Sequence, residues 1–380
     1  MLPAVELPPE VGQLLWRNYG RQVEVEFPNP KTEQQWRLTS QGWVGHIPLT
    51  SEFQLVLQPR VALANLFGML EYAYNLKSFH FLPGLVDCQS LAEFYERLAL
   101  LLARRVLDRA RQGFYRTYLA ESDRLPYVRG RLEMRPSLQQ PGQVKLQCHY
   151  EEHTADIAEN QILAWTLQAI ARSGKCTERV LPTVRRAYRS LQGLATPQPF
   201  EAEACLERFY HRLNDDYRPL HALCYFFLAQ SGPGHQLGER KMLPFLVDMA
   251  RLYERFAAEW LKAHAPRSFV VRSQVPVEVD HVSAFIDLVL FEADSRQPRW
   301  VLDTKYKLPD KPSNEDINQV VAYAEVKHCT EAVLIYPAPL AKPLDIRWGN
   351  IRVRSLTFAL TGNLEEAGNA FLRELLPERY

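Results

Sequence analysis

Two aspartates and a lysine on neighbouring strand-like segments are the residues of this sequence best suited to chemistry. The segment "AFIDLVLF" carries Asp287, and the segment "RWVLDTKYK" carries Asp303 and Lys305. Because side chains alternate between the two faces of a strand, Asp303 and Lys305 share one face and the Thr304 side chain points away from it. We expect this face to be polar and the opposite face to belong to the core.

The two segments also predict an antiparallel hairpin, because a polar connection, "EADSRQP", joins them. Ser295 lies midway between Asp287 and Asp303 and falls in this connection. Directly opposed residues have Cβ atoms about 4.5–5.5 Å apart, and two carboxylates at that separation repel unless a cation lies between them. Oxygen ligands favour Mg²⁺, with Mn²⁺ as a substitute. The sequence therefore predicts a metal site made by Asp287, Asp303 and the Thr304 carbonyl.

Three further polar residues extend this site. Lys305 is placed to orient or activate a water molecule and to stabilise negative charge that develops on a phosphate. Gln319 and Tyr323 are four residues apart in a helix predicted over 314–326, so they share one face of it. We expect the Gln–Tyr pair to contact the phosphate or the water around the metal. Ser313 and Asp316 fit a capping box at the start of this helix.

Acidic residues elsewhere in the C-terminal region are weaker candidates. Glu254, in a helix predicted over 245–263, is either a further carboxylate ligand of the metal or a solvated helix residue. Asp280 and Asp310 flank the two strand-like segments, and we expect both to lie outside the site.

Each candidate residue also has a purely structural interpretation. Asp287 could end a strand and pair with an arginine. Lys305 and Lys307 could protect an edge strand from aggregation. Gln319 and Tyr323 could form a surface pair on an amphipathic helix. The order and spacing of all these residues together favour the catalytic interpretation.

Hydrophobic periodicity predicts a multi-domain α/β (α+β) protein with three regions. Region 1–80 is β-rich, region 81–240 is mostly helical with a β excursion at 125–150, and region 241–380 holds a mixed sheet flanked by helices. The predicted strands are at 22–27, 42–49, 53–59, 268–279, 284–291, 299–307, 331–337 and 351–358. The predicted helices are at 61–76, 89–119 with Ser90 as N-cap, 157–173, 177–193, 201–230, 245–263 and 314–326. A linker is predicted at 231–240 from its glycine and proline content.

Composition restricts the class of protein. The chain has 380 residues, too many for one ordinary core, and its formal net charge of +1 gives no global basic field for nucleic acid, although a local basic groove is compatible with it. The six cysteines form no C-x-x-C pair, which indicates reduced thiols and no zinc ribbon. The sequence shows neither a secretion signal nor a run that could span a bilayer, so we expect a cytoplasmic protein.

The residues from Asp287 onward resemble a known nuclease core. Asp287, then Asp303-Thr304-Lys305, then Gln319-x-x-x-Tyr323, in the order helix, three strands, helix, strand, is similar to the PD-(D/E)xK superfamily. Ile286 replaces the proline that precedes the first aspartate in that motif. The resemblance implies a Mg²⁺-dependent endonuclease that hydrolyses phosphodiester bonds.

Longer segments resemble the McrC family, the nuclease subunit of McrBC-type 5-methylcytosine-dependent restriction systems. They are "FQLVLQPRVALANLFGMLEYAYNL", "YVRGRL", "ADIAENQILAWTL", "LNDDYRPLHALCYFFL" and "FLVDMARLYERFAAEWL". This resemblance implies a partner, a ring of McrB-like AAA+ GTPases that reads modified double-stranded DNA. It also implies that the N-terminal part of the chain docks in that ring and stimulates GTP hydrolysis, and that cleavage needs the partner. The chain has no P-loop motif of its own, which agrees.

Alternatives remain at this stage. The chain could be a regulatory adaptor of an AAA+ ring that does not cut DNA, or a repair nuclease that acts on DNA ends. We expect the partner to be contacted by the first 240 residues. Two segments there have two interpretations each, as solvated surface or as contacts to phosphate or partner: an arginine stripe (Arg104, Arg105, Arg109, Arg111, Arg116) and the turn Arg129-Gly130-Arg131.

Overall fold

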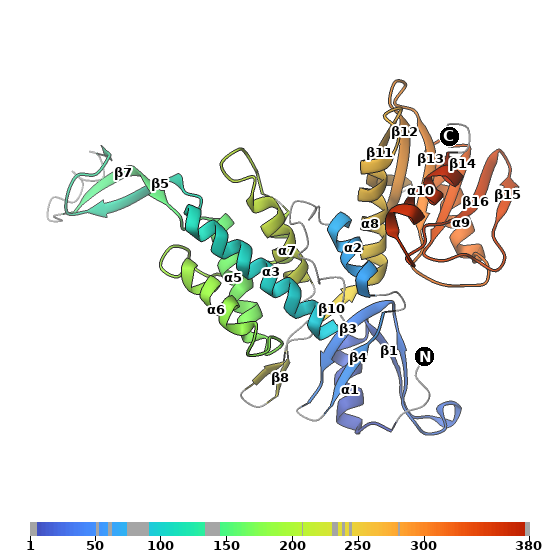
Figure 1. The fold of residues 1–380 in the computed structure, drawn as a ribbon, viewed down its shortest axis with the longest axis horizontal. Coiled ribbons are helices and arrows are strands. Elements are labelled where there is room, and N and C mark those ends of the chain that lie inside the picture. The colour runs from blue at the N-terminus through green and yellow to red at the C-terminus, as the bar shows by residue number, and fades with distance from the viewer. Residues whose placement is uncertain are drawn as a thin grey trace. The chain divides into compact units, whose positions relative to one another are not determined.

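The computed structural model describes most of the chain, and the statements below concern these residues: 6–50, 53–59, 63–73, 91–133, 145–206, 208–229, 235–237, 240–242, 245–279 and 282–376. The chain divides into two compact units (Figure 1). The first unites residues 1–94 with 230–380, and the second comprises 95–229. The regions 1–80 and 241–380, which the sequence analysis separated, therefore lie in one unit.

The N-terminal part of the first unit is a small β-rich body with its own core. Its elements are α1 (Pro9–Tyr19), β1 (Val23–Glu26), β2 (Arg37–Ser40), β3 (Trp43–Pro48) and β4 (Gln54–Leu57). β1 pairs with β2, and β3 pairs with β4. Leu15 and Tyr19 of α1 are fully buried in a cluster with Val23, Leu38 and Ile47. The strands predicted in this region are confirmed.

A strand from the C-terminal half completes this body. β10 (Phe245–Asp248) pairs antiparallel with β3. We predicted a helix from 245, which is wrong for these four residues. Helix α8 (Met249–His264) begins only after them, because the Asp248 carboxylate accepts the Arg251 N–H and so acts as the N-cap. Helix α2 (Leu63–Ala73) then packs on α8, and the Tyr72 and Phe256 rings meet edge to face.

The C-terminal part of the first unit is a six-stranded mixed sheet in the order β11-β12-β13-β14-β16-β15. β11 to β13 pair antiparallel, β13, β14 and β16 pair parallel, and β15 pairs antiparallel with β16. The strands are β11 (Phe269–Val279), β12 (Val282–Glu292), β13 (Pro298–Thr304), β14 (Glu331–Tyr336), β15 (Asp345–Trp348) and β16 (Ile351–Thr357). The multi-domain α/β fold is confirmed, but β15 was not predicted.

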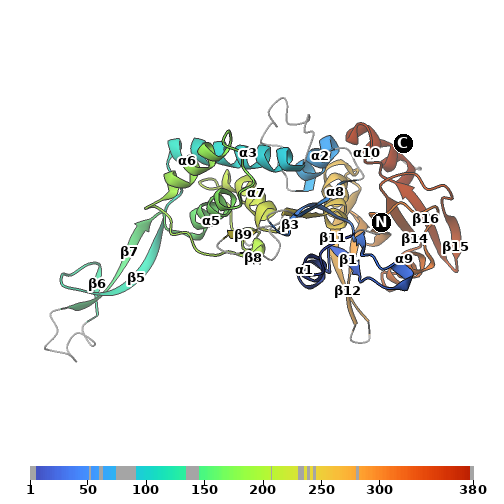
Figure 2. The same cartoon turned by 90° about the horizontal axis from the view of Figure 1, so that it is seen from below.

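Helices cover both faces of this sheet. α9 (Asn314–Val326) lies on one face, and α8 and α10 (Leu364–Leu375) lie on the other (Figure 2). Strand alternation directs Val289 and Val301 to the α9 side, where they join Val320 in one buried cluster. The predicted bounds of α9 are confirmed, as is its capping box of Ser313 and Asp316.

The hairpin that carries the candidate residues has the predicted register. Leu288 pairs with Leu302 and Val289 with Val301, so the centre falls at Ser295. β13 ends at Thr304, so both lysines of "DTKYK" follow the strand instead of lying within it. The chain nevertheless stays bound to β14 for one more residue, because Lys305 N donates to the Ile335 carbonyl at 2.8 Å.

The second unit is a set of helices with a projecting three-stranded sheet in the order β5-β7-β6. Its elements are α3 (Leu91–Gln112), β5 (Thr117–Leu125), β6 (Arg131–Leu132), β7 (Leu146–Thr154), α5 (Ala158–Arg172), α6 (Leu181–Leu191), a 3-10 turn (Ala202–Cys205) and α7 (Tyr217–Ala229). β5 pairs with β7 over their whole length. The helices predicted at 157–173 and 177–193 correspond to α5 and α6.

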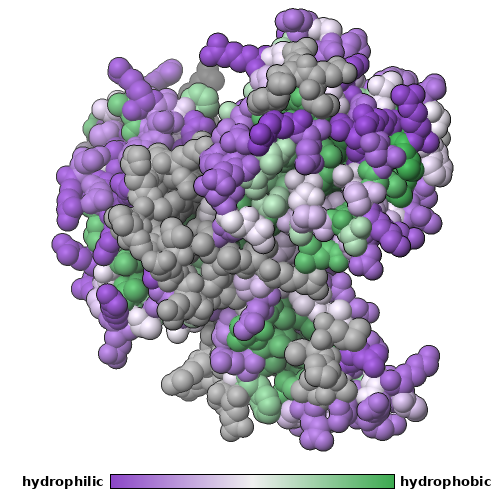
Figure 3. Space-filling view, turned by 45° about the vertical axis from the view of Figure 1, so that its right-hand side comes forward, coloured by the Kyte–Doolittle hydropathy of each residue, from purple (hydrophilic) through white to green (hydrophobic). Residues whose placement is uncertain are grey.

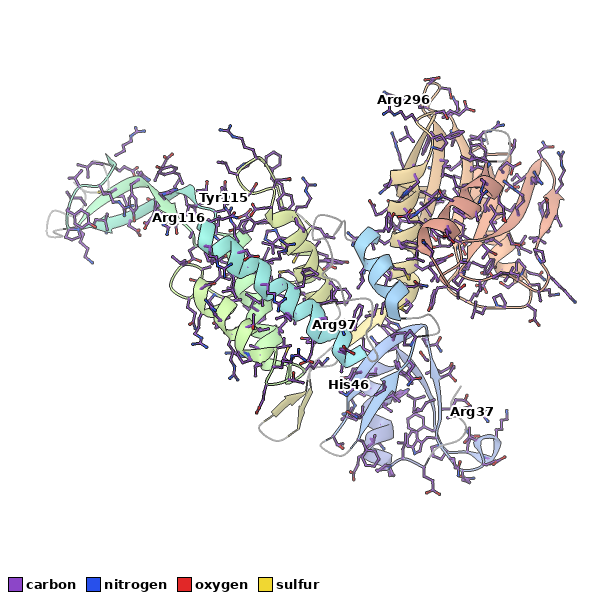
Figure 4. All side chains as sticks on the ribbon, in the orientation of Figure 1. Arg37, His46, Arg97, Tyr115, Arg116 and Arg296 are labelled. Atoms are coloured by element: carbon purple, nitrogen blue, oxygen red, sulfur yellow. The ribbon has the colours of Figure 1, made fainter. Side chains whose placement is uncertain are left out.

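Two predicted helices of this unit are too long. The helix predicted over 89–119 ends at Gln112, because Gly113 takes a left-handed conformation (φ 90°) and β5 follows. Tyr115 and Arg116, labelled in Figure 4, lie at this junction. In the helix predicted over 201–230, the α-helix begins only at Tyr217. The Asn214 side chain holds the preceding residues in a loop, because its Oδ1 accepts from His211 N and its Nδ2 donates to the Phe209 carbonyl. The proposed N-cap Ser90 lies outside the described residues.

Two strands, β8 (His235–Leu237) and β9 (Arg240–Met242), lie in or overlap the predicted linker at 231–240 and pair with each other. The arginines of the second unit are partly engaged within it. Arg109 pairs with Asp216 at 3.3 Å, and Arg129 pairs with Glu152 at 3.4 Å. Both arginines are therefore paired within the protein, which neither interpretation of these segments included.

No helix among the described residues is long and apolar enough to cross a membrane. The surface seen in Figure 3 is largely hydrophilic, with smaller hydrophobic areas between the polar ones.

We expect the second unit to lose stability in acid through His221. This fully buried ring accepts from Tyr210 OH at Nδ1 (2.8 Å) and donates from Nε2 to the Glu159 carbonyl (2.9 Å), and burial lowers its pKa from 6.5 to about 4. Between these values the unfolded state binds a proton that the folded state does not. The free energy of unfolding should therefore decrease as the pH is lowered, by about 2 kcal/mol between pH 7 and pH 5. Denaturant unfolding at pH 7 and 5 measures it, and His221→Gln should flatten the dependence; an equal slope in both proteins would contradict the assignment.

The contact between α10 and α8 should not tolerate a side chain at Gly368. A Cβ there would overlap the buried Trp260 ring. Overpacking costs about 1–3 kcal/mol, which outweighs the ~1 kcal/mol that alanine gains over glycine within a helix. Gly368→Ala should lower the denaturant midpoint, whereas Asn369→Ala, at the next and exposed position, should leave it unchanged or raise it. A stabilised Gly368→Ala protein would contradict this packing.

Candidate active site

Asp287 and Asp303 meet where β12 and β13 separate. The regular pairing ends at Leu288 and Leu302, and the two aspartates are the next residues in the same register. Asp287 Oδ2 accepts hydrogen bonds from Thr304 N at 2.8 Å and from Thr304 Oγ1 at 2.7 Å. Our expectation that the Thr304 side chain points away from the site is wrong, because Thr304 is the last residue of β13 and the strand alternation ends there.

Asp303 and Lys305 form a close ion pair, as their shared face predicted. Lys305 Nζ lies 2.7 Å from Asp303 Oδ2, and the Asp303 side chain is 2% exposed. The Lys305 ammonium group therefore compensates this buried oxygen, but it brings one positive charge to a place that two carboxylates share. Two carboxylates in this state are suited to bind a further cation.

Gln319 and Tyr323 lie next to the lysine. Lys305 Nζ donates to Gln319 Oε1 at 2.9 Å, and Gln319 Nε2 donates to Tyr323 OH at 3.0 Å. All three side chains are half-buried. The structure thus brings the Gln–Tyr pair to the site as a chain of hydrogen bonds that orients the ammonium group.

Glu254 reaches the same place from α8. Its carboxylate accepts from Gln274 Nε2. Gln274 has a left-handed backbone (φ 51°) within β11, and the pairing of β11 with β12 is interrupted at Gln274 and Asp287 alone. Strain of this kind costs about 1–3 kcal/mol and often marks a functional site. Sequence reasoning missed Gln274, because nothing in "VVRSQVPVEV" signals a positive φ.

The carboxyl groups of the site affect one another's protonation. Burial, and next the negative charge of Asp287, raise the pKa of Asp303 to about 6. Burial and the charge of Asp287 likewise raise the pKa of Glu254 to about 7. Burial alone would lower the pKa of Lys305, but the charge of Asp303 outweighs it and the pKa is raised. The acidic groups are therefore crowded and under-compensated.

Asp316 belongs to the site in a way that its capping role did not reveal. Its Oδ2 lies 2.6 Å from Lys307 Nζ, and its Oδ1 lies 3.8 Å from Lys305 Nζ. Tyr336 OH donates to the same carboxylate at 3.4 Å. Burial would raise the pKa of Asp316, but the hydrogen bonds from Lys307 and Ser313 outweigh it and the pKa is lowered. The capping-box spacing predicted that Asp316 lies at the start of the helix, but it did not predict the contacts of Asp316 with Lys305 and Lys307.

The donor set fits a hard divalent cation. Among the described residues, no group of three or more His, Cys, Asp or Glu side chains stands ready-made around a metal position. Asp287 and Asp303 instead supply two carboxylates at one strand end, and Lys305 is paired with one of them. The raised pKa values of Asp303 and Glu254 are relieved by positive charge. Water completes the shell of Mg²⁺ in many protein sites.

Asp310 takes no part in these contacts. It is exposed, and its carbonyl accepts from Lys342 N. Asp280 lies outside the described residues.

This chain is similar to proteins of McrBC restriction systems. A family model of the McrBC 5-methylcytosine restriction system component matches residues 38–337. The type IV methyl-directed restriction enzyme EcoKMcrBC of Escherichia coli (strain K12) is 22% identical over 241 residues, which cover 60% of this chain and 66% of that relative. The match thus spans just under two thirds of the relative's length.

A solved structure shows the same fold. A chain in the refined half-complex from the tetradecameric assembly of Thermococcus gammatolerans McrB AAA+ hexamers with bound McrC is 18% identical, with a TM-score of 0.58 over 97% of this chain and 93% of that one. A chain in the cryo-EM structure of the Thermococcus gammatolerans McrBC complex is 18% identical, with a TM-score of 0.44 over 67% and 81%. Because the family model spans well over half of the sequence, the chain belongs to the family of McrBC 5-methylcytosine restriction system components.

Proposed function

We propose that this protein is the Mg²⁺-dependent endonuclease subunit of an McrBC-like restriction complex. The observation that carries the proposal is the meeting of Asp287, Asp303 and Lys305 at the end of β13. Two carboxylates and an ammonium group that converge in a half-buried place can bind a metal and a phosphate together. The resemblance of these residues, with Gln319 and Tyr323, to the PD-(D/E)xK motif supports the same reaction.

The acidic residues of the site would bind the metal, and Lys305 would orient the attacking water. Asp287 and Asp303, with the Thr304 carbonyl and Glu254, would hold Mg²⁺, which when bound supplies positive charge to a phosphate oxygen. Thr304 N and Oγ1 fix the Asp287 carboxylate. Lys305, held by Asp303 and Gln319, would orient the attacking water and stabilise the charge that develops on the phosphate.

The partner and the DNA follow from the family. We propose a ring of McrB-like AAA+ GTPases as partner, since a similar fold occurs in a complex of McrB hexamers with bound McrC. The sequence contains no P-loop motif. In this proposal the partner hydrolyses GTP, and the present subunit stimulates that hydrolysis. The substrate is double-stranded DNA, modified at sites that the partner reads, and the complex works in the cytoplasm without a membrane.

Removing either catalytic charge should stop cleavage while leaving the assembly intact. We expect Asp287→Ala, which removes a metal ligand, and Lys305→Ala, which removes the group that orients the water, each to lower DNA cleavage in the partnered complex by about 100-fold or more. GTPase stimulation and co-purification with the partner should be unchanged. Asp310→Ala, which removes an exposed carboxylate nearby, is the control. Loss of assembly in both variants would make these residues structural, and DNA that stays uncut by the unmodified complex would favour the adaptor.

The metal should be needed for cleavage, and Glu254 should affect its affinity. Chelation with EDTA should abolish cleavage, and Mg²⁺ or Mn²⁺ should restore it. Glu254→Gln keeps the size of the side chain but removes one charge, so it should need about tenfold more Mg²⁺ for half-maximal cleavage. Glu259→Gln, on the same helix, is the control. An unchanged Mg²⁺ requirement in Glu254→Gln would place Glu254 outside the metal shell.

A further inference from the structure

Lys305 has two carboxylates within reach, and only one of them belongs to the proposed metal site. Its Nζ lies 2.7 Å from Asp303 Oδ2 and 3.8 Å from Asp316 Oδ1. Coulomb energy falls only as the inverse of distance, so at 3.8 Å against 2.7 Å a free Asp316 would attract this ammonium group about 70% as strongly as Asp303 does. Something must bias Lys305 toward Asp303.

Lys307 supplies that bias by neutralising Asp316. Its Nζ lies 2.6 Å from Asp316 Oδ2, closer than Lys305 is to either carboxylate. The Asp316 side chain is 7% exposed and the Lys305 side chain 18%, so water screens their charges only in part. The Lys307 side chain, at 44%, reaches the cluster from solvent.

The surrounding structure holds Asp316 in place. It lies in the first turn of α9, where Ser313 N and Tyr336 OH both donate to its Oδ2, at 3.4 Å each. Ser313 Oγ in turn accepts the Asp316 N–H at 3.2 Å. The carboxylate therefore cannot swing away from the lysines, and its charge must be met where it stands.

We infer that Lys307 is a positioning residue: it neutralises Asp316 and so keeps the catalytic Lys305 beside Asp303. The inference rests on the proposed function, because it concerns the same lysine. The four groups form a balanced set of two ammonium and two carboxylate charges. Deleting one charge from such a set leaves an unpaired partner, whereas deleting an opposite pair together does not.

Single and double charge deletions distinguish this role from a direct one. Lys307→Met leaves Asp316 unneutralised, so Lys305 should shift toward Asp316 by about the 1 Å that separates its two contacts. A shift of that size at a catalytic group lowers kcat by about 10- to 100-fold. The KM for DNA should stay within about twofold, since Lys307 does not bind substrate in this scheme.

The double variant Asp316→Asn with Lys307→Met is the decisive measurement. Asparagine keeps an oxygen that can accept from Ser313 N and Tyr336 OH, but it has no charge to attract Lys305. We expect the double variant to recover kcat to within about threefold of the unmodified complex, a coupling that two independent structural losses would not show. Ser313→Ala, which removes the cap hydroxyl without changing any charge, and Lys311→Met, at an exposed lysine nearby, should cleave normally.

The assay uses the full chain assembled with its AAA+ partner, at saturating Mg²⁺, with thermal unfolding measured in parallel. A raised KM in Lys307→Met that persists in the double variant would overturn the inference and make Lys307 a DNA contact. A normal kcat in Lys307→Met would overturn it as well. If the unmodified complex does not cut DNA at all, the proposed function fails and this inference falls with it, whereas failure of the double variant alone leaves the proposed function standing.

Discussion

The structure depends on one electrostatic constraint, the placement of acidic groups out of water at the end of β13. Asp303 is 2% exposed and has a second carboxylate, Asp287, beside it. Such an arrangement is unfavourable without compensation, because desolvation of two like charges costs several kcal/mol per ion. Lys305 provides part of the compensation, and a divalent cation is suited to provide the rest. Burying two carboxylates together lowers the stability of a fold, so such a pair is expected where the charges serve to bind a cation.

The sheet and its helices are arranged so that this constraint can be met. β13 lies inside the sheet between β12 and β14, so its carboxyl end carries Asp303 into a dry position. The separation of β12 from β13 at that point frees the Thr304 amide and hydroxyl for Asp287. The left-handed Gln274 interrupts β11 beside it and donates to Glu254. The strand pairing is therefore irregular at the places where the carboxylates of the site lie.

The first unit also shows how distant parts of the chain support the site. Glu254 is carried by α8, which begins directly after β10, and β10 is a strand of the N-terminal sheet. α2 packs on the same helix, and α10 contacts it through Gly368 and Trp260. A helix fixed on several sides can hold one carboxylate in a defined place, which a site of crowded charges requires.

The sequence by itself determined the hairpin register, the bounds of α9 and the identity of the residues that meet, because strand alternation, the polar turn around Ser295 and the Ser313–Asp316 cap are local signals. It did not determine the extent of the helices at 112 and 217, the strand at 245–248, or the Thr304 orientation. Only the tertiary structure decided these, together with the Gln274–Glu254 contact and the ion pairs of Asp316. The reason is physical: side-chain contacts between segments far apart in the chain depend on packing, which no local periodicity records.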